Sequence, residues 1–340
     1  MNSKVPLFIA EISANHLGDF ERARSLVKAA VAAGATAVKF QTYTAETMTL
    51  DSELEEFKIS AAHPLWGGRK LFDLYDEAHT PWSWHEELFD ICRSANVIPF
   101  SSPFDISAVD FLESINAPMY KIASMETGDH GLIRRVAETG KPLIISTGAT
   151  ELNEIDELVE VVEKSGNKDL TLLVCTSSYP ADPADAHLRR IKTIRDRYGL
   201  KVGLSDHTLG IGVSIAAIAL GATAIEKHLT LRRGDGGADG AFSMEPEEFS
   251  MLVNEGTIAF KALGNPTWRI QKSEMESRRL RRSLVVTQSV NPGDEISLEN
   301  INSIRPNIGM PSAKLESVLG KKFNKPMRRG DGLHQSDILE

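Results

Sequence analysis

Two histidines that stand beside carboxylates give the strongest chemical signal in this sequence. His207 lies in the segment Ser205-Asp206-His207-Thr208, and His228 ends the segment Glu226-Lys227-His228. Two imidazoles together with a carboxylate and water can hold a divalent transition metal. One structural histidine and one exposed histidine would be the alternative, but carboxylates beside both histidines favour a metal site.

Two lysines form a second signal, because each ends an apolar segment. Lys39 follows one such segment and Lys121 follows another. A lysine at the end of a buried strand is costly unless it meets an anion, so the pair suits a phosphate and a carboxylate on one substrate. Either lysine could instead form a Schiff base, as in an aldolase. Each could also reach solvent, or pair with Glu11 or Glu126.

Hydroxyl and carboxylate side chains follow the same apolar segments. The hydroxyls belong to Ser101, Ser102, Ser124, Ser146, Thr147, Thr176, Ser177, Ser178 and Ser205. One hydroxyl alone is more often a helix cap than a ligand, but residues 146–148 resemble a turn whose N–H groups could face an anion. Glu11 could orient sugar hydroxyls or act as a base. Asp239, in a glycine-rich segment, could reach an aldehyde or water.

These scattered groups can meet only if the strands that carry them close into a ring. Strands are predicted at residues 7–11, 37–41, 97–101, 119–123, 143–146, 170–175, 202–204 and 224–226. Helices are predicted at residues 20–33, 82–95, 106–115, 131–139, 152–165, 185–198, 212–220 and 246–263. Eight strand–helix pairs predict an α/β fold, a TIM (β/α)8 barrel whose strands share one mouth at their C-terminal ends. The rival, an open doubly wound sheet, would be favoured by a Gly-x-Gly-x-x-Gly turn after the first strand, and residues 13–18 lack it.

The chain is longer than one barrel requires. A barrel of this kind uses about 250 residues, and the chain has 340. We expect a catalytic barrel over residues 1–264, a linker over 265–280, and a small domain of short strands and tight turns over 281–340. Residues 44–81 form a long excursion that we expect to shape the substrate pocket.

Composition narrows the class of protein. With 41% hydrophobic and 25% charged residues, the chain is an ordinary globular protein, and its two cysteines favour a reducing cytoplasm. Residues 265–340 carry 13 Lys/Arg and 9 Asp/Glu, a net charge of +4. Since the net charge of the whole chain is −9, the remaining residues carry −13. An acidic barrel argues against nucleic acid as a partner. The first apolar run is too short for a signal peptide or a membrane span.

Several longer motifs resemble the sialic acid synthase family, from about Leu7 to the C-terminus. They are residues 9–16 (IAEISANH), 39–43 (KFQTY), 100–104 (FSSPF), 120–124 (YKIAS), 203–208 (GLSDHT) and 226–228 (EKH). The segment Ser303-Ile304-Arg305-Pro306 resembles the family's antifreeze-like (SAF, β-clip) domain. Residues 13–16, 41–43 and 235–243 look more like the pseudaminic acid branch than the N-acetylneuraminic acid branch.

The resemblance implies a reaction and a partner. Such enzymes condense phosphoenolpyruvate with an acetamido hexose and water, releasing phosphate and forming a nine-carbon 2-keto sugar acid. In the pseudaminic acid branch the sugar is 2,4-diacetamido-2,4,6-trideoxy-altropyranose. The resemblance also implies a domain-swapped homodimer, in which Arg305 reaches the barrel mouth of a partner subunit.

Residue roles follow from the same resemblance. Mn²⁺ or Mg²⁺ would be held by His207 and His228. The phosphoenolpyruvate would be bound by Lys39, Ser102, Lys121, Ser124, Thr147, Ser177 and Ser205. The sugar or the attacking water would be faced by Glu11, Tyr179 and Asp239, with Glu226 beside the metal and the intermediate.

Two positions depart from the pseudaminic acid branch. Val174 precedes Cys175 where that branch often has lysine, and Met310 precedes Pro311 where it often has histidine. Both departures concern the sugar rather than the reaction. The alternatives are therefore an N-acetylneuraminate or legionaminate synthase, a Schiff-base aldolase, or a non-catalytic protein of polysaccharide assembly.

Overall fold

The computed structural model describes residues 5–63 and 65–339, which divide into two compact units. The first unit is Met1–Gly264 and the second is Asn265–Glu340. Within the described residues, every helix is too short or too polar to cross a lipid bilayer.

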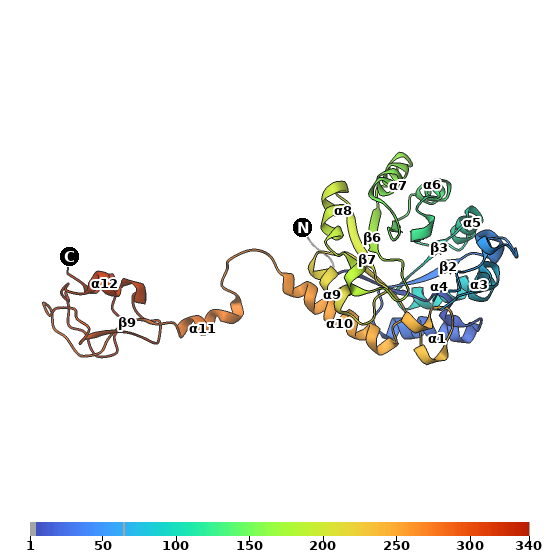
Figure 1. Ribbon diagram of the computed structural model, residues 1–340. Coiled ribbons are helices and arrows are strands. Elements are labelled where there is room, and N and C mark those ends of the chain that lie inside the picture. Colours follow the sequence, from blue (N-terminus) through green and yellow to red (C-terminus); the bar gives the residue numbers. More distant parts are fainter. Residues whose placement is uncertain (1–4, 64, 340) are drawn as a thin grey trace. The chain divides into compact units, whose positions relative to one another are not determined.

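The first unit is a closed barrel of eight parallel strands in sequence order (Figure 1). Its strands are β1 (Leu7–Glu11), β2 (Ala37–Thr42), β3 (Ile98–Pro103), β4 (Tyr120–Ile122), β5 (Leu143–Ser146), β6 (Leu170–Cys175), β7 (Lys201–Ser205) and β8 (Ala224–His228). The ring closes where β1 pairs with β8, with Glu11 opposite His228. The predicted TIM barrel is therefore confirmed, and all C-terminal strand ends meet at one mouth.

Helices connect the strands and cover the outside of the barrel (Figure 1). They are α1 (Phe20–Ala32), α4 (His85–Ser94), α5 (Ile106–Ser114), α6 (His130–Ala137), α7 (Leu152–Lys164), α8 (Arg190–Tyr198), α9 (Gly212–Ala219) and α10 (Pro246–Leu263). Aspartates start three of them: the side chains of Asp19, Asp105 and Asp129 accept hydrogen bonds from N–H groups of the first turn. Helix α8 begins later than predicted because His187 has a left-handed backbone, with φ +42°.

The barrel interior is layered, and the layers explain where the polar groups lie. A lower layer is apolar and consists of Ile9, Ala37, Phe100, Met119, Ile144, Leu173 and Ala224. Strand side chains alternate between faces, so the residues two positions further also point inward. Those residues are Glu11, Lys39, Ser102, Lys121, Ser146, Cys175 and Glu226. The remaining strand, β7, contributes Gly203 at this level, where a Cβ would lie 2.4 Å from Ala224 O.

The excursion between β2 and α4 is only partly helical. It contains α2 (Ala45–Met48) and α3 (Leu71–Ala78), joined by a segment with one 3-10 turn. Most of its large side chains are half-buried, which is typical of a segment that packs over an opening instead of inside a core.

The second unit has its own small core. Strands β9 (Ser283–Val286) and β10 (Ile301–Ile304) pair antiparallel, and α12 (Leu315–Val318) follows them. Ten buried apolar residues fill the unit, with Phe323 the largest. Residues 265–280, expected to be a linker, contain a short helix, α11 (Met275–Arg279).

Candidate active site

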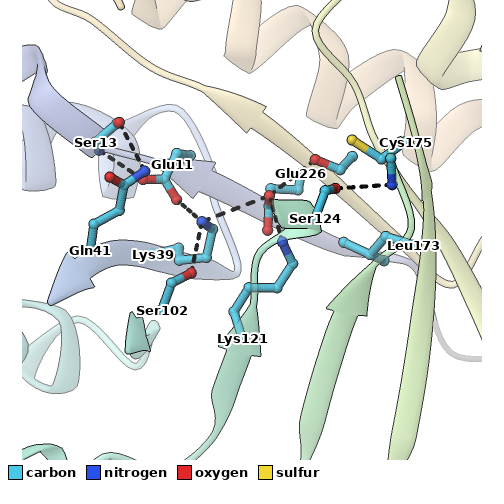
Figure 2. A network of polar contacts seen from close by, with 12 residues as sticks. Glu11, Ser13, Lys39, Gln41, Ser102, Lys121, Ser124, Leu173, Cys175 and Glu226 are labelled. Carbon is cyan, nitrogen blue, oxygen red and sulfur yellow. Dashed lines mark hydrogen bonds and ion pairs between the residues drawn. The ribbon is translucent and has the colours of Figure 1, made fainter. Parts of the chain in front are cut away.

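Two lysines and two glutamates form a buried charged layer above the apolar one (Figure 2). Lys39 forms an ion pair with Glu11, and its Nζ lies 3.8 Å from Glu226 Oε1. Lys121 Nζ lies 3.3 Å from the same oxygen. Glu226 thus lies between the two ammonium groups. Glu11, the other carboxylate that pairs with Lys39, lies on the far side of Lys39 from Glu226.

Burial and mutual attraction move the pKa values of this layer in different directions. Burial raises the pKa of Glu11 to about 7, although the Lys39 ammonium opposes that change. Burial also tends to raise the pKa of Glu226, but Lys121 and Lys39 outweigh it and lower the pKa overall. Burial lowers the pKa of Lys121, whereas Glu11 and Glu226 overcome burial at Lys39 and raise its pKa. The layer therefore holds a stable carboxylate at Glu226 and a stable ammonium at Lys39.

The two histidines lie together one layer higher. Their ring centroids are 5.4 Å apart. His207 Nδ1 lies 3.0 Å from the carbonyl oxygen of Thr176; since a carbonyl can only accept, Nδ1 carries a proton, and Nε2 is the nitrogen left for a metal. Burial lowers the pKa of His228 well below 6.5, so its imidazole is neutral. His228 is thus in the form that binds metals. At His207 burial tends to lower the pKa, but Cys175 and the carbonyl of Thr176 outweigh burial and raise the pKa, so a metal would compete with a proton at Nε2.

A metal ion fits this pair, although the protein alone does not complete a cage. His228 Nδ1 is buried without a hydrogen-bond partner, and its nearest acid, Asp239, has Oδ2 at 3.9 Å. A buried nitrogen of this kind calls for a partner, either an ordered water or a bound ion. Across residues 5–63 and 65–339 no three His, Cys, Asp or Glu side chains gather as metal ligands. The remaining ligands would have to be water or substrate oxygens.

Asp239 is held by the turn that follows β1. Its carboxylate accepts hydrogen bonds from the hydroxyl of Ser13 and, at 3.4 Å, from the N–H of Ala14. Gln41 Nε2 donates to the same serine hydroxyl at 3.1 Å, and the N–H of Ser13 donates to Glu11 Oε1 at 2.9 Å. A single serine therefore connects the loop after β8 with the charged layer.

Two serines meet above the turn that follows β5. The N–H of Gly148 donates to Ser124 Oγ at 3.0 Å, and a Cβ at Gly148 would lie 2.2 Å from Ser177 Oγ. The absence of a side chain at this glycine leaves room for both hydroxyls. Thr147 differs from expectation: its N–H and its hydroxyl both donate to the carbonyl of Leu173, so neither faces an anion.

These groups surround a cavity of about 420 Å³ at the barrel mouth. It is lined by nine of the predicted site residues: Lys39, Lys121, Ser124, Tyr179, Ser205, His207, Glu226, His228 and Asp239. Four others do not line the cavity: Glu11, Ser102, Thr147 and Ser177. Arg305 belongs to the second unit, where it follows β10 and is exposed.

The excursion supplies an apolar side to the cavity. Its contributions are Met48, Ile59, His63, Trp66, Leu71, Leu74, Tyr75 and Ala78. Trp66 Nε1 donates to the carbonyl of Ala238 at 3.0 Å, which fastens the excursion to the loop that carries Asp239. The excursion therefore shapes this cavity, as expected, and the binding of substrate there stays a prediction.

Several cavity residues were not predicted as site residues. Ser13, Gln41 and Tyr43 lie on the motifs noted above, and inward alternation from Glu11 and Lys39 would have identified the first two. Glu126 was considered only as a lysine partner. It lines the cavity, its Oε2 is buried without a partner, and burial raises its pKa to about 7.

The chain belongs to the NeuB family, which matches residues 26–267, and residues 281–339 match the SAF domain. The predicted family is thereby confirmed. Among curated relatives, the pseudaminic acid synthase of Campylobacter jejuni is 38% identical over 335 residues, covering 98% of this chain and 97% of the relative. The pseudaminic acid synthase of Helicobacter pylori is 39% identical and covers 98% of each chain.

A solved structure shares the architecture. The N-acetylneuraminic acid (sialic acid) synthetase of Leptospira borgpetersenii, in complex with citrate, is 32% identical with a TM-score of 0.72. The match covers 81% of this chain and 90% of that chain.

Proposed function

We propose that this chain condenses phosphoenolpyruvate with an acetamido hexose and water, forming a nine-carbon 2-keto sugar acid and phosphate. One observation carries the proposal: two ammonium groups, two imidazoles and Glu226 line a single cavity at the mouth of a NeuB-family barrel. Phosphoenolpyruvate carries a phosphate and a carboxylate, and two fixed cations suit those two anions.

The charged layer forms the phosphoenolpyruvate site in this proposal. Lys39 and Lys121 bind the carboxylate and the phosphate, and Ser124 and Ser205 add hydroxyl donors from the same walls. Ser205 Oγ already donates to Glu226 Oε1 at 3.1 Å, so Ser205 orients this carboxylate between the lysines. Ser102 accepts a hydrogen bond from Lys39 Nζ at 3.4 Å, and Ser177 lies beside Ser124 at Gly148, where it completes the pair of hydroxyls proposed for the phosphoenolpyruvate. Thr147 bonds the carbonyl of Leu173 and has no direct role in this proposal.

Carbon 3 of phosphoenolpyruvate attacks the sugar aldehyde, and carbon 2 gains the character of an oxocarbenium ion. Water adds at carbon 2, and the resulting tetrahedral intermediate expels phosphate. Glu226 lies where it can stabilise the cationic carbon, and Lys39 and Lys121 stabilise the departing phosphate. Glu11, with a pKa near 7, and Asp239 are the candidates for moving protons at the water and the sugar.

A divalent cation, Mn²⁺ or Mg²⁺, would be held by His207 and His228 and would polarise the aldehyde oxygen. The fit rests on the neutral imidazole of His228 and its buried, unpartnered Nδ1. Asp239 lies beside this nitrogen and can position the sugar at the same point.

The sugar in this proposal is 2,4-diacetamido-2,4,6-trideoxy-altropyranose, which makes the product pseudaminic acid. An apolar cavity side suits a 6-deoxy carbon and acetamido methyl groups better than free hydroxyls. Residues of the excursion, including Ile59, Leu71 and Leu74, provide that side. The two relatives at 38% and 39% identity point to the same sugar.

A panel of substrates tests the proposal. The purified chain is given phosphoenolpyruvate, Mn²⁺ and one of three sugars, the precursors of pseudaminic, legionaminic and N-acetylneuraminic acids, and released phosphate is measured. We expect phosphate release with the trideoxy-altrose sugar at a kcat/KM at least about tenfold above the others, since each misplaced polar group costs about 1–3 kcal/mol. A preference for another sugar would keep the reaction and replace the substrate.

One observation favours a second candidate reaction. Burial lowers the pKa of Lys121, which is what a Schiff-base lysine requires. Borohydride with a keto substrate would trap such an adduct on Lys121. Inhibition by a chelator together with phosphate release would exclude this candidate.

The contribution of a second copy rests on the sequence resemblance. Arg305 is exposed on the second unit, and the two parts of the chain carry opposite charges, +4 and −13. A guanidinium from a partner subunit would add a cation for the acetamido sugar or the anionic intermediate.

A further inference from the structure

An ion pair inside the barrel wall has no place in the chemistry proposed above. Lys227 Nζ lies 3.1 Å from Asp206 Oδ2, and both side chains are only 1% exposed. Neither residue lines the cavity, because strand alternation turns both outward from the barrel axis. Desolvating two charges can cost more than their attraction returns, so a buried pair is weak evidence of stabilisation.

The Lys227 ammonium binds three acceptors from one short segment, residues 206–210. Besides Asp206, it donates to the carbonyl of Thr208 at 2.6 Å and to that of Gly210 at 3.0 Å. Asp206 is equally well satisfied: Oδ1 accepts from the N–H and hydroxyl of Thr208 at 2.9 and 2.7 Å. Its Oδ2 accepts from Ser214 Oγ of α9 at 2.5 Å. The ammonium group of Lys227, on β8, therefore holds segment 206–210 in place.

This network lies directly behind the two imidazoles. His207 sits within the fixed segment, next to Asp206, and His228 follows Lys227 in β8. Both imidazoles line the cavity, on the opposite face from the ion pair. A movement of segment 206–210 along the wall would therefore change the 5.4 Å separation of the two rings.

We infer that Lys227 is a positioning residue that sets the spacing of His207 and His228, and with it the affinity of the site for a divalent cation. The inference rests on the proposed assignment of these histidines as metal ligands. Groups that orient metal ligands from behind typically change metal affinity about 10–100-fold when they are removed. The two lysines proposed to bind phosphoenolpyruvate, Lys39 and Lys121, lie on β2 and β4, so the affinity for phosphoenolpyruvate should depend far less on Lys227 than the affinity for the cation does.

The test is the substitution Lys227→Met, which keeps the length of the stem and removes the ammonium. Mn²⁺ binding to the purified full chain is followed through the electron paramagnetic resonance of free Mn²⁺, and phosphoenolpyruvate binding is measured separately without metal. We expect the Kd for Mn²⁺ to rise about tenfold or more, with the Kd for phosphoenolpyruvate unchanged. High Mn²⁺ concentrations should restore turnover.

Lys201→Met is the matched control, because Lys201 begins the neighbouring strand and pairs with Asp169 at 2.8 Å in an exposed position. It should bind Mn²⁺ as the parent does. Ser214→Ala, a milder variant, removes one hydrogen bond to Asp206 and should weaken Mn²⁺ binding to a smaller extent. It provides the test if Lys227→Met does not fold.

The outcomes separate this inference from the proposed function. Unchanged Mn²⁺ affinity in both network variants, with a parent that binds Mn²⁺, would overturn the role of Lys227 and leave the metal pair in place. Equal losses of Mn²⁺ and phosphoenolpyruvate binding would also overturn it, since they indicate a loosened barrel. A parent chain that binds no Mn²⁺ would instead remove the proposed metal pair itself.

Discussion

Adding one methyl group at Gly148 should disturb the proposed phosphoenolpyruvate site without removing any of its side chains. A Cβ at this position would lie 2.2 Å from Ser177 Oγ, 2.9 Å from Ser124 Oγ and 3.1 Å from Cys175 Sγ. Contacts this short cannot persist, so both hydroxyls must rotate away. Because the atoms that clash are the ends of small side chains, we expect Gly148→Ala to fold, with a stability loss of roughly 1–3 kcal/mol.

Gly148→Ala should also weaken the binding of phosphoenolpyruvate, in addition to lowering the free energy of unfolding. A hydrogen bond to a charged group contributes about 1.5–3 kcal/mol, so displacing one serine from an anionic substrate corresponds to a loss of about 10–100-fold in affinity. We therefore expect the KM for phosphoenolpyruvate to rise within that range. The KM for the sugar should change much less, because the sugar is proposed to bind on the histidine side of the cavity.

Steady-state phosphate release as a function of phosphoenolpyruvate measures this effect, and thermal unfolding measures stability in the same preparations. Gly128→Ala is the matched control, since a Cβ there meets nothing within 4 Å. It should leave KM within about twofold of the parent, as exposed substitutions usually do. A Gly148→Ala enzyme that unfolds at a lower temperature but keeps its KM would refute the placement of phosphoenolpyruvate against these serines.

Three further predictions concern other parts of the molecule. Burial raises the pKa of Glu126 to about 7, so this residue contributes stability below pH 4.5 that is lost as the pH rises through 7. Between pH 5 and pH 8, the free energy of unfolding measured in urea should therefore fall by up to roughly 3 kcal/mol more in the parent than in Glu126→Gln. The exposed control Glu157→Gln should follow the parent, and identical pH dependence in all three proteins would contradict the burial argument. Trp66→Phe removes the hydrogen bond to Ala238, which contributes about 1 kcal/mol, and should raise the KM for the sugar about fivefold while leaving the KM for phosphoenolpyruvate unchanged. Parallel changes in both KM values would count against this role of Trp66. Arg305→Ala should lower kcat without changing the unfolding of the barrel, and unaltered kinetics would remove Arg305 from the site.

Much of the fold could be predicted from the sequence because local signals agreed with the final packing. Short apolar runs alternate with helical segments, and capping aspartates such as Asp19 and Asp105 mark helix starts. The sequence did not predict the late start of α8, because His187 interrupts the helical pattern with a left-handed backbone. A glycine at this position would have indicated such a conformation, but histidine does not. Boundaries set by one residue's backbone are not visible in hydrophobic periodicity.

The site was predictable where a polar residue interrupts an apolar strand, as at Lys39, Lys121 and Glu226. It was not predictable where the contact joins segments far apart in the chain. The hydroxyl of Ser13 meets a carboxylate 226 positions away, and the indole of Trp66 meets a carbonyl 172 positions away. Neither residue has a chemical type that demands such a partner, so only the closed barrel and its excursion bring them together.

The apolar layer beneath the charged one makes the cavity a blind-ended chamber. Side chains such as Phe100, Ile144 and Leu173 seal its base, so molecules can enter and leave only through the mouth. The reactant that contacts the deepest cations must arrive first, and a sugar above it blocks its escape. Phosphoenolpyruvate held by Lys39 and Lys121 would thus be committed to reaction as soon as the second reactant arrives, and phosphate, formed at the base, would depart after the sugar acid.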